Sequence, residues 1–589
     1  MKLAWCLIVG LLSALTHVTP VVAQDATTPG HVQSHSTIYS IGIEWTITGD
    51  ANHNASVAVQ YRIQGATVWN AALPLLRVDY NGFNGLAGSV LFLTPDTTYE
   101  IALILSDPDG GTASRIVTRA TRPLPTLPAD GRTFHVVPGT GGGDGSAARP
   151  FRGIDAAQAV ARPGDIFLLH AGSYAGRPAF KVPGAPRDYV VWKAAGDGEV
   201  VLVGGLDVRT DHVWVEGVTI RDLPNGLMSQ YCPHDVVISR NHFVNNHYNI
   251  YLQQGGDGWY IADNDIAGDV VAATGVLDGE GIFLNNSDSY GGGPTRACGS
   301  NNHTVAHNRI TNCADGIDNP GDNVDIFGND IFDVADDGIE LDSGEHVRVW
   351  GNRVHNAVHN AISFQPQVGA PWYIIRNQLV INEEAPLKLR VVNGVPTTDR
   401  FVLLHNTIVN WDQMLCCNDD HLLFSFARNN LWILAAGGRL WWFAGRRSWK
   451  TDIDYDGFDY GAAPLPAAPF LYNRIEYWDL ASLAAASGLE QHGIHIDKDR
   501  CLATFNVPGP SPASVPPQFM TLQAGCNAID AGVVLPNIND TNFLGEAPDL
   551  GAYESGQPLP VYGPRPVASS SPSTASPEQS SVPYVPNSR

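Results

Sequence analysis

The chain has 589 residues and a formal net charge of −24, with 59 acidic against 35 basic side chains. So acidic a chain is a poor partner for nucleic acid, whose phosphates attract basic surfaces. Glycine and proline are frequent (60 and 40 residues) and methionine is scarce (4), which favours a β-rich protein with many turns over a helical one. The length exceeds what one ordinary core supports, although a solenoid can run this far as one body.

The first 23 residues have the composition of a secretory signal peptide. Lys2 is followed by an apolar run over residues 3–15, and a small residue, Ala23, ends the segment. We expect cleavage before Gln24 and a secreted protein that is extracellular, periplasmic or held at the cell surface. No later stretch reaches the ~20 apolar residues that a membrane-spanning helix needs. The sequence does not determine the oligomeric state, and a monomer is our expectation.

Residues 33–122 have the pattern of a small β-sandwich. Short alternating runs such as residues 56–61 are separated by turn residues. The run from Leu93 to Tyr99 reads Leu-Thr-Pro-Asp-Thr-Thr-Tyr and resembles the fibronectin type III pattern, in which the tyrosine makes a corner hydrogen bond. This resemblance implies that Trp45 is the buried aromatic residue of an early strand, and that the unit is a spacer or an accessory binding unit.

An Asn-centred segment then recurs along the chain at intervals of 21 to 29 residues, apart from one interval of 44 that contains an insertion. An apolar residue follows each of these asparagines two positions later. The period matches one coil of a right-handed parallel β-helix, which we predict for residues 132–554. The fold class is therefore all-β, a parallel β-helix preceded by a fibronectin type III-like β-sandwich. The repeated residues are Asn241, Asn264, Asn308, Asn329, Asn352, Asn377, Asn406 and Asn429.

The two ends of the solenoid and its cysteines give further expectations. A short helix over residues 154–161 is predicted to cover the N-terminal end, which would otherwise expose a sheet edge. The tail, residues 555–589, is rich in serine and proline and is expected to be disordered. Seven cysteines remain after removal of the signal peptide, so at least one is free or paired with another chain. Cys298–Cys313 and Cys501–Cys526 are the candidate local bridges.

The most polar stretches of the repeat lie in adjacent coils between residues 278 and 390. Aligning the coils places a short strand after Asp315, Asp337 and Asn360, and alternation turns one set of side chains outward. Strands of successive coils are ~4.8 Å apart, so carboxylates in this set would repel unless a cation or a shared proton intervenes. Asp-Gly pairs alone are typical of turns. The outward set is Asp318, Glu340, Ser363 and Lys388, continued two residues on by Asp342, Gln365 and Arg390.

The opening of the solenoid and this acidic column resemble polysaccharide lyase family nine, pectate lyases of the β-helix superfamily. The likeness is carried by Arg149-Pro150-Phe151, by Pro163-Gly164-Asp165 and by residues 336–340, which are similar to that family's D-D-G-x-D calcium motif with Glu340 in the last place. The resemblance implies a Ca²⁺-assisted β-elimination on a uronic-acid-containing polysaccharide. It implies Asp315, Asp336, Asp337 and Glu340 as calcium ligands, Lys388 as the base and Arg390 as its partner. Their outward position makes Asp318, Asp342 and Gln365 the candidate substrate-binding residues.

Two other interpretations stay open. The order of an Asp, an Asp-Asp pair, a His and a Lys/Arg pair also resembles glycoside hydrolase family twenty-eight, the polygalacturonases, which implies inverting hydrolysis and a catalytic role for His359. In this sequence that family's R-x-K is reversed as Lys388-Leu389-Arg390, and its G-H-G is Val358-His359-Asn360. The third interpretation is a non-catalytic glycan-binding or adhesin solenoid, because a fold alone does not imply activity. A tryptophan-rich stretch could stack on sugars in that case: Trp411, Trp432, Trp441, Trp442 and Trp449.

Overall fold

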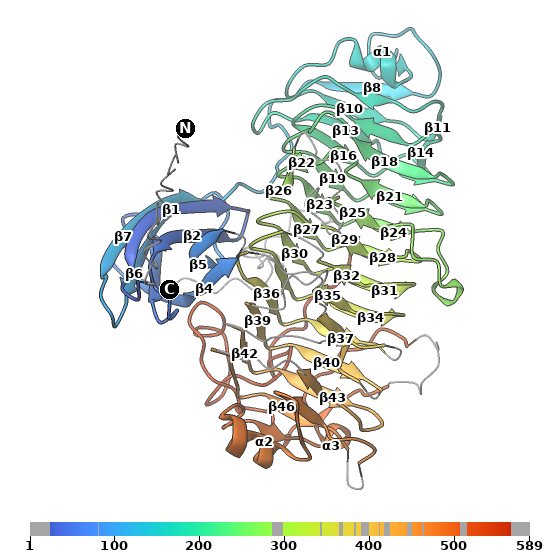
Figure 1. The fold of residues 1–589 in the computed structure, drawn as a ribbon. Coiled ribbons are helices and arrows are strands. Elements are labelled where there is room, and N and C mark those ends of the chain that lie inside the picture. The colour runs from blue at the N-terminus through green and yellow to red at the C-terminus, as the bar shows by residue number, and fades with distance from the viewer. Residues whose placement is uncertain are drawn as a thin grey trace, which may run out of the picture.

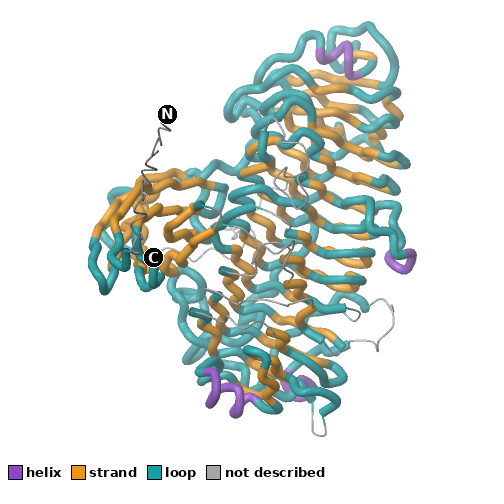
Figure 2. Tube along the Cα trace, viewed as in Figure 1, coloured by secondary structure: helices purple, strands orange, loops and turns teal. Residues whose placement is uncertain are grey.

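The computed structural model describes residues 24–80, 82–285, 298–341, 344–364, 369–381, 384–389, 400–411, 413–416, 425–443, 450–461, 465–506 and 515–566. An antiparallel sheet unit at the N-terminus lies against the side of a long parallel β-helix (Figure 1). Strands and loops make up almost all of the described chain, and most of its short helices lie at the ends of the solenoid (Figure 2). The predicted all-β class is confirmed. Among the described residues, none of the helices combines the length and apolar character needed to cross a membrane.

The N-terminal unit is a seven-stranded antiparallel arrangement whose long strand β4 pairs with β3 through its first half and with β5 through its second. This layout is compatible with a sandwich. Trp45 is fully buried, and the Thr94 amide donates to the Tyr99 hydroxyl at 2.9 Å, as expected of a tyrosine corner. The fibronectin type III assignment itself stays a prediction. The strands are β1 Thr28–Ser36, β2 Ile41–Thr48, β3 Ser56–Ile63, β4 Asn70–Tyr80, β5 Phe83–Val90, β6 Thr98–Ser106 and β7 Ala113–Ala120.

In the described part of the chain, the solenoid is built from three parallel sheets of 14, 13 and 10 strands, and most coils contribute one short strand to each sheet. In chain order, the first sheet contains β8 Thr133–Val137, β9 Phe151–Arg152, β10 Ile166–Leu169, β13 Val190–Ala194, β16 Val213–Glu216, β19 Val237–Ser239, β23 Tyr260–Ala262, β27 Thr304–Ala306, β30 Asp325–Phe327, β33 Arg348–Trp350, β36 Trp372–Ile375, β39 Phe401–Leu404, β42 Phe426–Arg428 and β45 Asp452–Asp454. The second contains β11 Gly172–Tyr174, β14 Val200–Leu202, β17 Thr219–Arg221, β20 His242–Val244, β24 Asp265–Ala267, β28 Arg309–Thr311, β31 Asp330–Val334, β34 Arg353–Ala357, β37 Gln378–Val380, β40 Thr407–Asn410, β43 Leu431–Leu434, β46 Gly457–Asp459 and β49 Ile494–His495. The third contains β12 Ala179–Phe180, β15 Leu206–Val208, β18 Asn225–Ser229, β21 Tyr248–Tyr251, β25 Ile282–Phe283, β29 Ile317–Asp318, β32 Ile339–Glu340, β35 Ile362–Phe364, β38 Leu387–Leu389 and β41 Leu415–Cys416.

Smaller elements complete the described chain. The helix predicted at the N-terminal end of the solenoid is present as α1 Ile154–Gln158 and lies over that end (Figure 1). The remaining elements are the strands β22 Gly256–Asp257, β26 Ser300–Asn301, β44 Trp441–Phe443, β47 Phe470–Tyr472 and β48 Ile475–Tyr477, and the helices η1 Ala272–Thr274, α2 Leu480–Ser487 and α3 Lys498–Cys501. Among the described residues, solenoid strands run from Thr133 to His495, and residues 515–554, at the end of the predicted range 132–554, pack on the outside of the solenoid.

The repeated asparagines form a continuous buried ladder between the first and second sheets. In each rung the backbone amide and the side-chain Nδ2 both donate to the Oδ1 of the next coil, for example from Asn329 to Asn352 at 3.0 and 2.9 Å. Nδ2 also donates to a main-chain carbonyl, as Asn352 does to Ile326. The ladder therefore satisfies the polar main-chain atoms that a tight bend leaves without partners.

The predicted position of one asparagine of the ladder was wrong by one residue. Asn406 donates to Asn430 rather than Asn429, and Asn430 donates in turn to Asp456, which ends the series. The residue before each rung has a positive φ, from Arg240 (56°) to Tyr455 (62°), and Asn429 (62°) occupies this left-handed position. Asparagine adopts that conformation readily, so two adjacent asparagines could not be ranked by the sequence pattern.

Replacing a central rung is expected to destabilise the solenoid strongly. In Asn352→Ala the amide and Nδ2 of Asn329 and the carbonyl of Ile326 lose buried partners, and each such loss costs about 1–3 kcal/mol. We expect a loss of at least about 2 kcal/mol in the free energy of unfolding, measured by chemical denaturation. Asn225→Ala, which alters a partly exposed asparagine of β18 outside the ladder, is the control and is expected to stay within about 0.5 kcal/mol of the parent. Equal stability of the two variants would contradict a structural role for the ladder.

Two further expectations need correction. Cys298 pairs with Cys232 and not with Cys313, which is buried and free, whereas the Cys501–Cys526 bridge is confirmed. The Cα atoms of Cys232 and Cys298 lie 6.0 Å apart although 66 residues separate them in sequence, so local spacing was the wrong guide. Residues 555–566, expected to be disordered, lie against the solenoid, where the Arg565 guanidinium pairs with Asp263 at 2.7 Å. A few anchoring side chains outweigh the serine- and proline-rich composition there; residues 567–589 lie outside the described range.

The outer faces of two of the three sheets are covered by other parts of the chain. Apolar residues of the N-terminal unit, including Tyr39 and Phe92, pack on the first sheet around Phe327 and Trp350. The C-terminal segment covers the second sheet, for instance where Leu550 joins a cluster with neighbouring strand residues. The outer face of the third sheet carries acidic, basic and aromatic side chains instead, so this is the face on which to look for a site.

Candidate functional site on the third sheet

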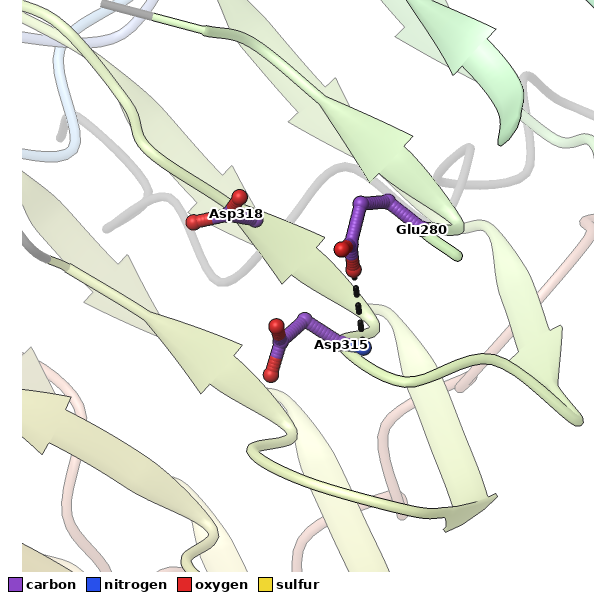
Figure 3. A group of neighbouring side chains, drawn as sticks. All are labelled: Glu280, Asp315 and Asp318. Carbon is purple, nitrogen blue, oxygen red and sulfur yellow. Dashed lines mark hydrogen bonds between the residues drawn. The ribbon is translucent and has the colours of Figure 1, made fainter. Parts of the chain in front are cut away.

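A stack of acids lies at the bend that leads into the third sheet. The Asp315 amide donates to Glu280 Oε2 at 2.9 Å (Figure 3), and the Asp337 amide donates to Asp315 Oδ1 at 2.8 Å. All three carboxyl groups are buried, with residue exposures of 6%, 4% and 0%. In the next coil the stack continues with Asn360, which donates to the Ala385 carbonyl. These acids therefore occupy the kind of position that asparagines fill at the other bend.

A glycine follows each acid because the coils approach one another closely there. A Cβ atom at Gly281, Gly316 or Gly338 would lie 2.4 to 2.7 Å from the carbonyl oxygen of the next coil. The repeated acid-Gly-Ile pattern is thus partly a packing requirement. Packing does not require an acid instead of an asparagine at these positions, because asparagine would stack equally well. The acidity of the stack is therefore the feature that packing does not explain.

The predicted outward column forms in the predicted register. Asp318, Glu340, Ser363 and Lys388 are cross-strand partners in successive coils of the third sheet. Lys388 reaches back over the small, buried Ser363, so that its Nζ lies 3.1 Å from Asp337 Oδ2 and 3.9 Å from Glu340 Oε1. The two coils that separate Lys388 from the acidic motif in sequence are therefore spanned by its side chain.

Two groups of three carboxylates are close enough to share a cation. Oxygen atoms of Asp315, Asp336 and Asp337 all lie within 4.8 Å of one another, and so do those of Glu280, Asp315 and Asp318 (Figure 3). Three of the four predicted metal ligands thus converge. Glu340, the fourth, lies in neither group and is instead a partner of Lys388. Sequence reasoning missed Glu280 as a site residue, although its Glu-Gly-Ile sequence matches the Asp-Gly-Ile of the next coils.

The triad of Asp315, Asp336 and Asp337 fits a calcium ion in its donor chemistry. Ca²⁺ prefers six to eight oxygen ligands, with carboxylates foremost. Asp337 Oδ1 is fully buried and has no hydrogen-bond partner in the described part of the chain, so one lone-pair position there is left for another ligand. A cation would also relieve the repulsion between these groups.

Burial and mutual repulsion raise the pKa values of these acids. Burial raises the pKa of the Glu280 carboxyl to about 7, while the Asp315 amide opposes the shift. Burial raises the pKa of Asp315 well above its usual range, and the Glu280 carboxylate adds to the shift. Burial also raises the pKa of Asp337 well above its usual range, although the Lys388 ammonium opposes it. Proton uptake by the stack is therefore favoured, and a bound cation would compete with these protons.

Lys388 and His359 are the nitrogen bases beside the stack. Burial lowers the pKa of Lys388, but the carboxylates of Asp337 and Glu340 outweigh this and raise its pKa above that of a free lysine. His359 Nδ1 lies 2.7 Å from Asp336 Oδ1, and both of these side chains are partly exposed. Lys388 is thus held as an ammonium ion by its carboxylate neighbours, and His359 marks the outer edge of the site. Three predicted site residues, Asp342, Gln365 and Arg390, lie outside the described residues.

Comparison with known proteins agrees with the architecture. Residues 225–390, which include the acidic stack and Lys388, match the family described as "Right handed beta helix region". No curated protein matches the chain. A solved structure titled "The complex structure of XylC with xylose" is similar at a TM-score of 0.35 and 12% sequence identity, over 62% of this chain and 83% of that chain, which is too low to bear on function. The family match and the order of the parallel strands establish a right-handed parallel β-helix.

Proposed function

We propose that this chain is an exported, calcium-assisted polysaccharide lyase that cleaves a uronic-acid-containing polysaccharide by β-elimination at the third sheet. The observation that carries the proposal is the convergence of the Asp315, Asp336 and Asp337 carboxylates within 4.8 Å, with the Lys388 ammonium 3.1 Å from Asp337. Oxygen ligands for calcium and a nitrogen base are the groups that this elimination needs. The Cys232–Cys298 and Cys501–Cys526 disulfides support an oxidising, extracytoplasmic location.

The roles follow from the positions of the side chains. Asp315, Asp336 and Asp337 would hold Ca²⁺, which when bound neutralises the uronate carboxylate and so makes the adjacent C5 proton acidic. Lys388 would take that proton, because Asp337 and Glu340 favour its ammonium form and so favour proton uptake. The same partners keep the neutral lysine scarce at pH 7. Activity should therefore rise with pH through the neutral and alkaline range.

An inverting hydrolase is the second candidate, favoured by the raised pKa values of the buried acids, since a general acid must carry a proton. Against it, the closest oxygens of Asp315, Asp336 and Asp337 lie within 4.8 Å, whereas inverting pairs are usually ~6.5–9.5 Å apart to admit a water molecule. In the binding-module alternative, Trp432 and Trp441 cannot serve as sugar platforms because both are buried in the solenoid core. Trp449 lies outside the described residues.

The assay that separates these candidates follows the products. On a panel of uronate polymers, we expect release of unsaturated oligosaccharides, detected by ultraviolet absorbance, to fall at least about hundredfold with a chelator and to return with excess Ca²⁺. Without the cation the uronate carboxylate is not neutralised, so its C5 proton stays weakly acidic and the acids of the stack repel the substrate. Reducing ends without unsaturated products, unaffected by chelator, would identify the hydrolase. Retention of a polymer in affinity electrophoresis with neither product would identify a binding protein.

A further inference from the structure

Three aromatic rings are stacked on the third sheet directly before the acidic site. Tyr251 on β21 and Phe283 on β25 are cross-strand partners with ring centroids 5.1 Å apart and planes 8° from parallel. Tyr248 joins them, with its centroid 5.2 Å from that of Tyr251. All three side chains are partly exposed on the outer face of the third sheet. We refer to these three residues as the aromatic stack.

The aromatic stack and the acidic site belong to one column. Asp318 is the cross-strand partner of Phe283 in the next coil, and Glu280 lies three residues before Phe283 in the same coil. Figure 1 shows the strands concerned, β21, β25, β29 and β32, in successive coils. Phe283 is partly exposed, and because an aspartate side chain is much shorter than that of phenylalanine, we infer that Asp318 leaves the ring face on that side open. The stack therefore ends in an apolar wall beside the acids.

The chemistry at this wall suits a neutral sugar. A pyranose ring offers apolar C–H groups that pack on an aromatic face, with hydroxyl groups at its edge that need hydrogen-bond partners. Asp278, which accepts a hydrogen bond from the Tyr248 hydroxyl, supplies an acceptor nearby. Its carboxylate would repel that of a uronate residue. His247, the neighbouring base, already contacts Asp269 at 3.1 Å and Asp278 at 3.5 Å.

The two ends of the column therefore differ in charge and in apolar character. Lys388 is its cation among the described residues, and four strand spacings of ~4.8 Å place its backbone about 19 Å from that of Phe283. A uronate residue is drawn to the end with the cation and the calcium ligands. A neutral sugar residue suits the aromatic end, where it can stack on the Phe283 ring. The calcium ligands begin with Asp315, in the coil next to Phe283, so the two ends suit neighbouring residues of one polysaccharide.

We propose that the aromatic stack is a subsite for a neutral pyranose residue, so that the substrate is a mixed polysaccharide that carries neutral sugars next to the uronate that is cleaved. The place of this subsite in the substrate rests on the proposed function. Its affinity for neutral sugars does not, because it needs neither calcium nor Lys388. The subsite and the cleavage chemistry can therefore be tested apart.

Binding of neutral oligosaccharides to the full-length protein is the direct test. Calorimetric titration in chelator with gluco-, manno-, galacto- and xylo-configured tetrasaccharides is expected to give binding for at least one of them. Phe283→Leu keeps the apolar volume but loses the flat ring, and should weaken that binding at least about tenfold, which is about 1.4 kcal/mol. Phe283→Tyr keeps the ring and should retain it. Trp478→Ala, which removes an exposed tryptophan between β48 and α2, is the matched control and should change nothing.

Kinetics separate this proposal from the proposed function. On mixed polymers, Phe283→Leu should raise KM about tenfold with little change in kcat, and on homopolymers of uronate it should have no effect. Absence of binding by every neutral tetrasaccharide, or equal binding by the parent and Phe283→Leu, overturns the subsite. Ring-dependent binding without elimination on any polymer upholds the subsite and overturns the lyase. Elimination on mixed polymers with a KM that Phe283→Leu leaves unchanged upholds the lyase and overturns the subsite.

Discussion

Lys388→Met is expected to lower kcat for elimination at least about hundredfold, the usual contribution of a positioned base. Methionine keeps much of the length and apolar stem of lysine, so the packing over Ser363 is preserved while the proton acceptor is lost. In the parent, the Nζ atom lies 3.1 Å from Asp337 and its ammonium form is stabilised there. The measurement is initial-rate kinetics on a uronate polymer at saturating calcium.

Lys193→Met provides the control, because Lys193 also forms an ion pair, with Glu216 at 3.0 Å, but on the first sheet. It should keep full activity. Thermal unfolding of both variants shows whether any loss of rate comes from misfolding. Full elimination activity in a folded Lys388→Met protein would contradict the assignment of the base.

The pH dependence of stability and activity in the parent protein follows from the direction in which the pKa of Lys388 is shifted. The pKa of Lys388 is raised in the folded chain, so the ion pair stabilises the protein fully below the unfolded pKa and this contribution is lost as pH rises through the folded pKa. The neutral base becomes available over the same interval. Activity should thus increase with pH until the loss of this ion pair begins to cost stability.

The fold could be read from the sequence because its repeat is set by local rules. Buried asparagines recur once per coil and an inward apolar residue follows each, so both periodicities are visible without coordinates. The register of the outward column followed from the same repeat. Contacts between distant segments had no such signature. The Cys232–Cys298 bridge and the Arg565–Asp263 pair each depend on which coils or segments become neighbours, which composition and spacing do not encode.

The site was predictable in outline but not in its electrostatics. The sequence placed Asp315, Asp337 and Lys388 in neighbouring coils, yet it could not show that Lys388 reaches across Ser363 to Asp337. Nor could it separate Glu340, which pairs with the lysine, from the carboxylates that converge. Side-chain reach and burial decide both points, and they depend on the three-dimensional packing of the coils.

Asp315→Asn is expected to make the calcium-free protein more stable and to abolish its activity. Asparagine retains the oxygen that accepts the Asp337 amide at 2.8 Å, so the stack keeps its hydrogen bond. It removes a charge that burial and the Glu280 and Glu340 carboxylates oppose, since these raise the pKa of Asp315 well above its usual range. It also removes a central oxygen ligand of the predicted calcium site, and elimination should fall at least about hundredfold.

The stability gain should grow with pH, and its sign follows from proton linkage. A carboxyl with a raised pKa in the folded chain binds a proton that the unfolded chain has released, so the parent loses stability as pH rises from about 4 toward the folded pKa. Each pH unit between the unfolded and the folded pKa corresponds to about 1.4 kcal/mol of stability. Asp315→Asn does not lose this stability, because it has no carboxyl group at this position to titrate. Denaturation in chelator at a series of pH values measures this gain in stability.

Asp330→Asn, which strips the bidentate partner from Arg353 in the same solenoid, should destabilise the protein at every pH. Added Ca²⁺ should stabilise the parent more than Asp315→Asn, and equal stabilisation would mean that calcium binds elsewhere.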